Sequence, residues 1–137
     1  MRIVQFTVTG RPLAKGRVRF TKTGHAFTPE RTVGFEGKLA LAAQVAMDGR
    51  PPVEGPVAVT LEVHLPIAVS WSKKKQASAV AGQLRPTGRP DLDNFAKMLD
   101  ALNLVVWHDD AQIVELVVFK RYSLQPQLAI TVDAICS

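Results

Sequence analysis

A strictly alternating stretch in the middle of the chain constrains the fold most. Apolar residues occupy every second position over residues 57–65, and Pro66 follows directly. Successive side chains of a β-strand point to opposite faces of a sheet, so this spacing predicts a strand with one buried face. Such a strand needs hydrogen-bonding neighbours and a layer that covers its apolar face. The stretch therefore predicts a sheet with another layer packed upon it.

The remaining patterns predict both strands and helices. Apolar alternation and turn residues predict further strands at residues 3–8, 17–20, 25–27, 113–122 and 128–134. Helical periodicity, caps and breakers predict helices at residues 29–47, 72–81 and 91–103. Together these elements predict an α+β fold, a mixed β-sheet of about five or six strands packed with about three helices.

The chain is expected to form one domain over residues 1–137. Its 137 residues, 47% of them apolar, can bury a hydrophobic core, and no linker divides the sequence. The single cysteine, Cys136, excludes an intramolecular disulfide and a cysteine-rich zinc site. We find no signal-peptide pattern and no apolar run of membrane-spanning length, so we expect a cytoplasmic protein without a membrane partner.

Two short segments, residues 91–97 and 109–110, place four carboxylates and a lysine close together in the sequence of an otherwise basic chain. They are Asp91, Asp93, Lys97, Asp109 and Asp110. Carboxylates repel each other, so a tight cluster usually needs a cation. Mg²⁺ is the common solution because it prefers oxygen ligands and keeps water molecules for chemistry. The cluster therefore indicates a metal site, and in a basic protein it favours a nuclease.

The spacing around Asp91 predicts two faces on one helix. The core stripe comprises Leu92, Phe95, Leu99 and Leu102. The residues Asp93, Lys97 and Asp100 lie on a different face, and Asp91 can cap the helix start. Taken alone, Asp-x-Asp is more often a cap and a surface ion pair than a metal site.

The adjacent acids Asp109 and Asp110 favour the metal site. They precede a predicted strand, where one carboxylate can point toward the helix N-terminus and complete a three-carboxylate site. The alternative is an exposed turn, in which aspartate is common.

Charge is divided unevenly along the chain. Residues 1–90 carry 14 basic and 5 acidic residues, whereas residues 91–137 carry 3 basic and 7 acidic ones. A solvated basic surface would also explain this division. If the protein is a nuclease, the phosphate backbone of DNA is the natural partner of the cations. The candidate DNA-binding residues are Lys15, Arg17, Arg19, Lys73, Lys74, Lys75, Arg85 and Arg89.

The order of these residues resembles that of the RusA-type Holliday junction resolvases, which phages and prophages often carry. The resemblance rests on Pro90–Lys97, Asp100–Asn103 and Asp109–Ile113, with further similarity at residues 15–19, 27–29 and 70–75. Two departures occur. Lys97 and Asp100 are one residue closer together than in most members, and Leu104 replaces a frequent glycine, for which we expect Asn103 to supply the left-handed cap.

The resemblance implies a homodimeric endodeoxyribonuclease that nicks four-way DNA junctions in pairs during recombination and repair. It implies Mg²⁺, for which Mn²⁺ can substitute, and metal ligands at Asp91, Asp93 and Asp110. Lys97 is then the essential lysine beside the phosphate, and Asp109 and Asp100 support the ligands from outside. The expected location is the nucleoid of a bacterial or phage-infected cell.

Three other functions compete with this one. Asp-x-Asp also binds metal in many glycosyltransferases, although the length of this chain argues against one. A non-catalytic basic DNA-binding module would use the acids only as caps and ion pairs. A flap- or branched-DNA nuclease would share the chemistry but not the preference for four-way junctions.

Overall fold

The computed structural model describes residues 1–14, 19–20, 26–27 and 30–135. In chain order the elements are β1 (Arg2–Thr9), β2 (Arg19–Phe20), β3 (Ala26–Phe27), α1 (Glu30–Met47), β4 (Val57–Pro66), α2 (Lys73–Val80), α3 (Leu92–Ala96), the 3₁₀ helices η1 (Lys97–Leu102) and η2 (Asp110–Gln112), β5 (Ile113–Ser123) and β6 (Gln127–Ala134). Every predicted strand and helix has a counterpart, and the predicted α+β class is confirmed.

The central sheet is mixed and has the strand order β1-β6-β4-β5. β6 pairs antiparallel with β1 and with β4, whereas β4 and β5 run parallel. This sheet has four strands rather than five or six, because β2 and β3 pair with each other in a separate two-stranded sheet. The alternating stretch became β4, an interior strand, and Pro66 ends it as predicted.

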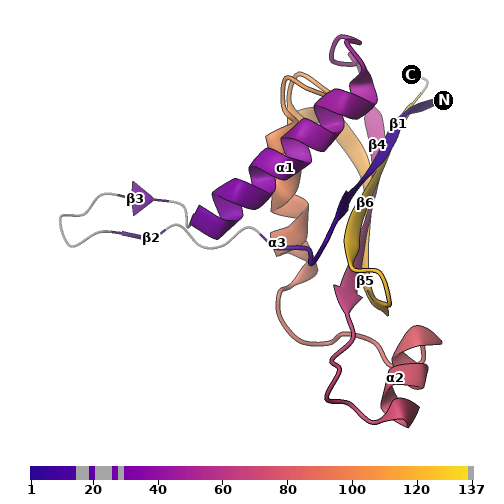
Figure 1. Cartoon of the computed structure of the whole chain (residues 1–137). Coiled ribbons are helices and arrows are strands. Elements are labelled where there is room, and N and C mark those ends of the chain that lie inside the picture. Colours follow the sequence, from indigo (N-terminus) through magenta and orange to yellow (C-terminus); the bar gives the residue numbers. More distant parts are fainter. Residues whose placement is uncertain (15–18, 21–25, 28–29, 136–137) are drawn as a thin grey trace.

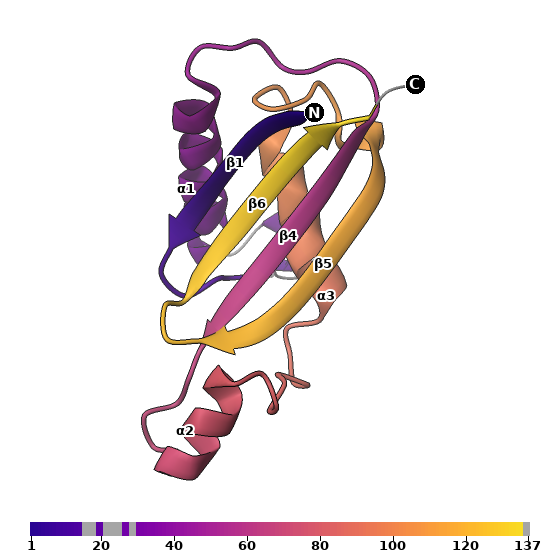
Figure 2. The same ribbon diagram turned by 90° about the vertical axis from the view of Figure 1, so that its right-hand side faces the viewer.

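Helices cover one face of the sheet, and the core lies between them. Figure 2 shows α1 and the α3–η1 segment behind the four strands, and Figure 1 shows both on the same side of the sheet. Leu61 of β4 stands opposite Ile130 of β6, and both are fully buried. Leu39 of α1 and Phe95 of α3 are also fully buried in this core. No helix in the described part of the chain is long and apolar enough to cross a membrane.

The helix predicted over residues 91–103 consists of two pieces. α3 is α-helical, but from Lys97 the chain continues as the 3₁₀ helix η1. The predicted core stripe holds for Phe95, Leu99 and Leu102, while Leu92 is 39% exposed. A 3₁₀ helix rises faster per residue than an α-helix, so the segment is stretched and its faces turn relative to the α-helical prediction.

The turn after η1 differs from the expected one. Leu104 itself adopts the left-handed conformation, with φ of 68°, and its side chain is exposed. Asn103 keeps a negative φ, and its side-chain oxygen accepts a hydrogen bond of 2.8 Å from the indole of the buried Trp107. The turn therefore uses the asparagine as a side-chain anchor, which leaves the left-handed position to the next residue.

Candidate active site

Asp91 and Asp93 lie at the exposed start of α3. Asp91 has the extended backbone of an N-cap residue, yet its side chain makes no capping hydrogen bond. Asp93 lies in the first turn, 3.8 Å from the ammonium of Lys97, and both side chains are more than half exposed. Lys97 also approaches the side-chain oxygen of Asn94, at 3.5 Å. Both carboxylates are therefore open to a metal ion from solvent, and Asp93 already has a cation beside it.

Lys120 fixes the segment that leads into Asp91. Its ammonium donates hydrogen bonds to the carbonyl oxygens of Gly88, at 2.6 Å, and Pro90, at 2.9 Å. Lys120 lies on β5 opposite the buried Val63, so it emerges from the helix-covered face of the sheet. Lys120 is not among the candidate residues predicted from the sequence. The sequence signal for it is a lysine that continues the series of apolar side chains Leu116 and Val118 on the helix-covered face of the strand.

Gln112 fixes the second acidic segment, a turn at residues 108–112 that we call the acidic turn. Its side-chain oxygen accepts from the amides of His108 and Asp109, while its side-chain nitrogen donates to the carbonyls of Val53 and Gly55. The Asp109 carboxylate in turn caps η2 by accepting from the amide of Ala111, at 3.0 Å. The spacing Asp-x-x-Gln matches a capping box, a signal that could have identified Gln112.

Like charges crowd the acidic turn. The pKa of Asp110 is raised, first by a hydrogen bond with the side chain of Asp109, then by burial and by the negative charges of Asp109 and Asp100. The pKa of Asp109 is lowered, mainly because the amide of Ala111 donates to its carboxylate. A divalent cation would relieve this crowding, and carboxylate oxygens are the donors that a hard cation prefers.

The two acidic groups lie at opposite ends of the α3–η1 segment. Asp110 faces Asp100 of η1, whereas Asp91 begins α3. From Asp91 to Asp100 the helical rises amount to about 15 Å. Among the described residues, no three His, Cys, Asp or Glu side chains lie close enough together to hold a metal ion. The described part of one chain therefore does not gather the acidic pair and the helix N-terminus into one three-carboxylate cluster, and the metal site stays a prediction.

Most of the described candidate DNA-binding residues lie at the same end of the molecule as Asp91. α2 lies at the same end of the molecule as the start of α3, beyond the C-terminal ends of β4 and β5 (Figures 1 and 2). It begins with Lys73, Lys74 and Lys75, and the exposed Arg85 and Arg89 lie in the loop between α2 and α3. Arg19 lies in β2. Lys15 and Arg17 fall outside the residues that the structure describes.

A family profile and a bacterial relative each match most of the length of this chain. The profile of a family described as "Endodeoxyribonuclease RusA" matches residues 9–133. The "Uncharacterized protein YqaN" of Bacillus subtilis (strain 168) is 40% identical over 140 residues, which cover 96% of this chain and 96% of that protein. The family match spans both acidic groups, Lys97 and the segment between them.

Proposed function

Because this chain belongs to the RusA endodeoxyribonuclease family, we propose that it hydrolyses phosphodiester bonds of four-way (Holliday) junctions during DNA recombination and repair. The observation that carries the proposal is the family match over residues 9–133, which includes both acidic groups and their lysine. The reaction would depend on Mg²⁺, with Mn²⁺ as a substitute, and would take place on nucleoid DNA in the cytoplasm of a bacterial or phage-infected cell.

The metal would be held by Asp91, Asp93 and Asp110. The uncapped carboxylate of Asp91 and the crowded carboxylate of Asp110 are hard oxygen donors that favour a divalent cation. When bound, Mg²⁺ supplies an activated water and neutralises charge on the phosphate. Asp109 and Asp100 orient Asp110 from its two sides.

The chain's own cations would position the DNA. Lys97, held beside Asp93, lies near the scissile phosphate and stabilises the negative charge that develops there. Lys73 and Lys74 of α2, with Arg85 and Arg89, bind the phosphates that flank the cut. These contacts give affinity and register without reading the base sequence.

A homodimer would bring the two acidic groups together. One chain holds them about 15 Å apart along α3–η1, too far for one ion whose carboxylate bonds are about 2 Å long. In a two-fold dimer, Asp110 of one protomer can meet Asp91 and Asp93 of the other, and symmetry repeats the arrangement. Such a dimer contains two equivalent sites, which matches paired nicks across a four-way junction.

The product pattern of a synthetic four-way junction tests this function. With Mg²⁺ we expect nicks at two symmetry-related positions, no cutting of a linear duplex of the same sequence, and no cutting with a chelator. Equal cutting of flaps and three-way branches would favour a general branched-DNA nuclease. Tight junction binding without any cutting, in Mg²⁺ or Mn²⁺, would leave a non-catalytic DNA-binding module.

A further inference from the structure

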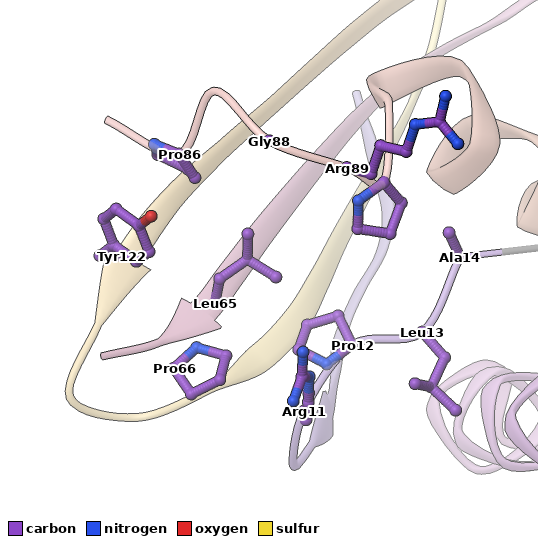
Figure 3. A pocket seen from close by; sticks show the side chains of 11 residues that line it. Arg11, Pro12, Leu13, Ala14, Leu65, Pro66, Pro86, Gly88, Arg89 and Tyr122 are labelled. Carbon is purple, nitrogen blue, oxygen red and sulfur yellow. The ribbon is translucent and has the colours of Figure 1, made fainter. Parts of the chain in front are cut away.

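A cavity of about 350 Å³ lies directly beside the start of α3. Three parts of the chain form it: the segment after β1, the C-terminal ends of β4 and β5, and the loop that leads into Asp91. Figure 3 shows Arg11 and Pro12 at one side of the cavity and Tyr122 at another, with Leu65 between them. Pro90, the residue before Asp91, also lines it. A ligand in this cavity would therefore lie next to the proposed metal ligands.

We propose that this cavity is a base pocket, which receives one unpaired nucleobase of the strand that is cut. The inference rests on the proposed nuclease function and adds a binding site to it. Bases at a branch point are less constrained by stacking than bases within a duplex, so moving one out of the helix costs less there. The pocket would hold the cut strand by a base as well as by its phosphates, and would select branched DNA over linear duplex.

The chemistry of the walls suits a nucleobase attached to a phosphate backbone. Proline rings and the ring of Tyr122 offer flat apolar surfaces, on which a base of any identity can stack. The charged lining residues are Arg11 and Arg89, and of the eleven described residues that line the pocket none is acidic. A volume of about 350 Å³ lies at the lower end of the range for small-ligand sites and is far too small for a duplex.

The pocket is held in shape before any ligand binds. Lys120 ties Gly88 and Pro90 to β5 through its two hydrogen bonds. Tyr122 packs edge-to-face on Trp71, with ring centres 5.2 Å apart, and the ammonium of Lys75 lies 4.2 Å from the centre of the Trp71 ring. A wall that is already ordered loses little freedom on binding, which favours a binding site over an incidental gap.

An abasic scan of the junction tests the base pocket. Each nucleotide around the cut site is replaced in turn by an abasic one, and both the cleavage rate in Mg²⁺ and junction affinity in chelator are measured. For the wild-type protein we expect one position, within about two nucleotides of the cut, to lower one or both by about tenfold, as loss of a stacked base does. The same scan is run on Arg11→Ala, Tyr122→Ala and Arg121→Ala, each first shown to be folded by its thermal melt.

Arg121 provides the matched control. It neighbours Tyr122 on β5 but points to the opposite face of the sheet, where its guanidinium lies 4.3 Å from the centre of the Phe119 ring. We expect the abasic penalty to fall below about threefold in Arg11→Ala or Tyr122→Ala, and to stay near tenfold in Arg121→Ala, because only contacting groups couple.

The two proposals can fail separately. The base pocket is overturned if no abasic position lowers the cleavage rate or the junction affinity. It is also overturned if the abasic penalty stays near tenfold in both pocket variants, even when the protein cuts junctions normally. If the protein cuts no branched DNA, yet the position-dependent penalty on affinity in chelator still vanishes in a pocket variant, the base pocket stands and the nuclease function falls.

Discussion

The two ends of the α3–η1 segment carry carboxylates in opposite settings. At the first end, Asp91 and Asp93 are exposed. Asp91 makes no capping hydrogen bond, Asp93 pairs with Lys97 at 3.8 Å, and the lysines of α2 lie at the same end of the molecule. At the second end, Asp109 and Asp110 sit in a turn that Gln112 fixes, and their charges crowd each other and Asp100. The first end can attract a polyanion, and the second can attract a cation.

From this difference we infer that the first end binds DNA phosphates and the second end binds the metal ion. Electrostatic attraction would draw DNA phosphates to the first end, where Lys97 and the α2 lysines lie. The acidic turn would repel DNA until a divalent cation neutralises it. A dimer that joins the two ends would therefore couple metal binding to DNA binding at one site.

The largest expected effect is on catalysis at the first end. Asp93→Asn removes a proposed metal ligand and keeps its shape, and we expect junction cleavage to fall by at least about a hundredfold. Junction affinity in chelator should stay within about threefold, because the variant removes only a negative charge, which can repel DNA but cannot bind its phosphates. Asp133→Asn, which removes a carboxylate that pairs with Arg2 at 2.9 Å, is the control and should cut normally. Normal cutting by Asp93→Asn would refute the metal assignment.

The next effect tests how the first end is held. Lys120→Met removes two hydrogen bonds to the segment before Asp91 while it keeps the apolar stem. Misplacement of a site by about 1 Å can cost about a hundredfold in rate, so we expect kcat to fall about 10- to 100-fold. Junction affinity should fall less than kcat, because Lys120 contacts backbone carbonyls rather than DNA and acts on binding only through the pocket wall that it holds. An unchanged kcat would show that this clamp does not position Asp91.

A smaller effect separates the basic end from the rest of the surface. In the double variant Lys73→Ala/Lys74→Ala, we expect weaker junction binding and a log–log salt slope that is shallower by about one to two units, one for each lost phosphate contact. Lys38→Ala, on the exposed surface of α1, is the matched control and should leave the slope unchanged. Equal slopes in all three proteins would remove α2 from the DNA interface.

The smallest effect concerns stability at the acidic turn. A carboxyl with a raised pKa binds its proton more tightly in the folded state, so its contribution favours folding at low pH and is lost as pH rises from 3.8 through the raised value. Asp110→Asn should therefore raise the thermal midpoint at pH 7. The gain in the free energy of unfolding should not exceed about 1 kcal/mol, because water screens surface charges. The gain should shrink near pH 3.

Asp109→Asn should have the opposite sign. The pKa of Asp109 is lowered, so its charged form favours folding above pH 3.8, and this contribution is lost as pH falls through the lowered value. Thermal melts of both variants in chelator, at pH 7 and near pH 3, compare the two signs. Shifts in the same direction would contradict the description of the turn.

The sequence predicted the elements well and their tertiary arrangement only in part. Alternation alone identified β4, and a helix start at Asp91 followed from local residues that the structure confirms. The change to a 3₁₀ helix at Lys97 cannot be predicted from neighbouring residues alone, because it depends on how Met98 and Leu99 are buried against the core. In α1, Ala43 and Met47 are buried whereas Ala42 and Ala46 are only half-buried, and this choice likewise depends on how the helix packs on the sheet.

The candidate site shows a similar limit. The acidic residues were identifiable from their types and order, but their distances were not, since the path of α3–η1 decides which carboxylates meet. Asp100 lies beside Asp110 for that reason. The role of Lys120 could not be predicted from its sequence neighbours, because its partners are backbone carbonyls 30 or more positions away in the chain.

Mixing two inactive variants tests the central claim most directly, namely that each site takes one end from each protomer. Differently tagged Asp93→Asn and Asp110→Asn chains are co-expressed and the heterodimer is purified. In that dimer one site loses Asp93 and Asp110, and the other site keeps all three ligands. We therefore expect about half of the wild-type cleavage rate, with single nicks rather than paired ones. A heterodimer of Asp91→Asn with Asp93→Asn should remain inactive, because both sites are damaged. If the Asp93→Asn/Asp110→Asn heterodimer is as inactive as its parents, the two ends do not combine across the dimer.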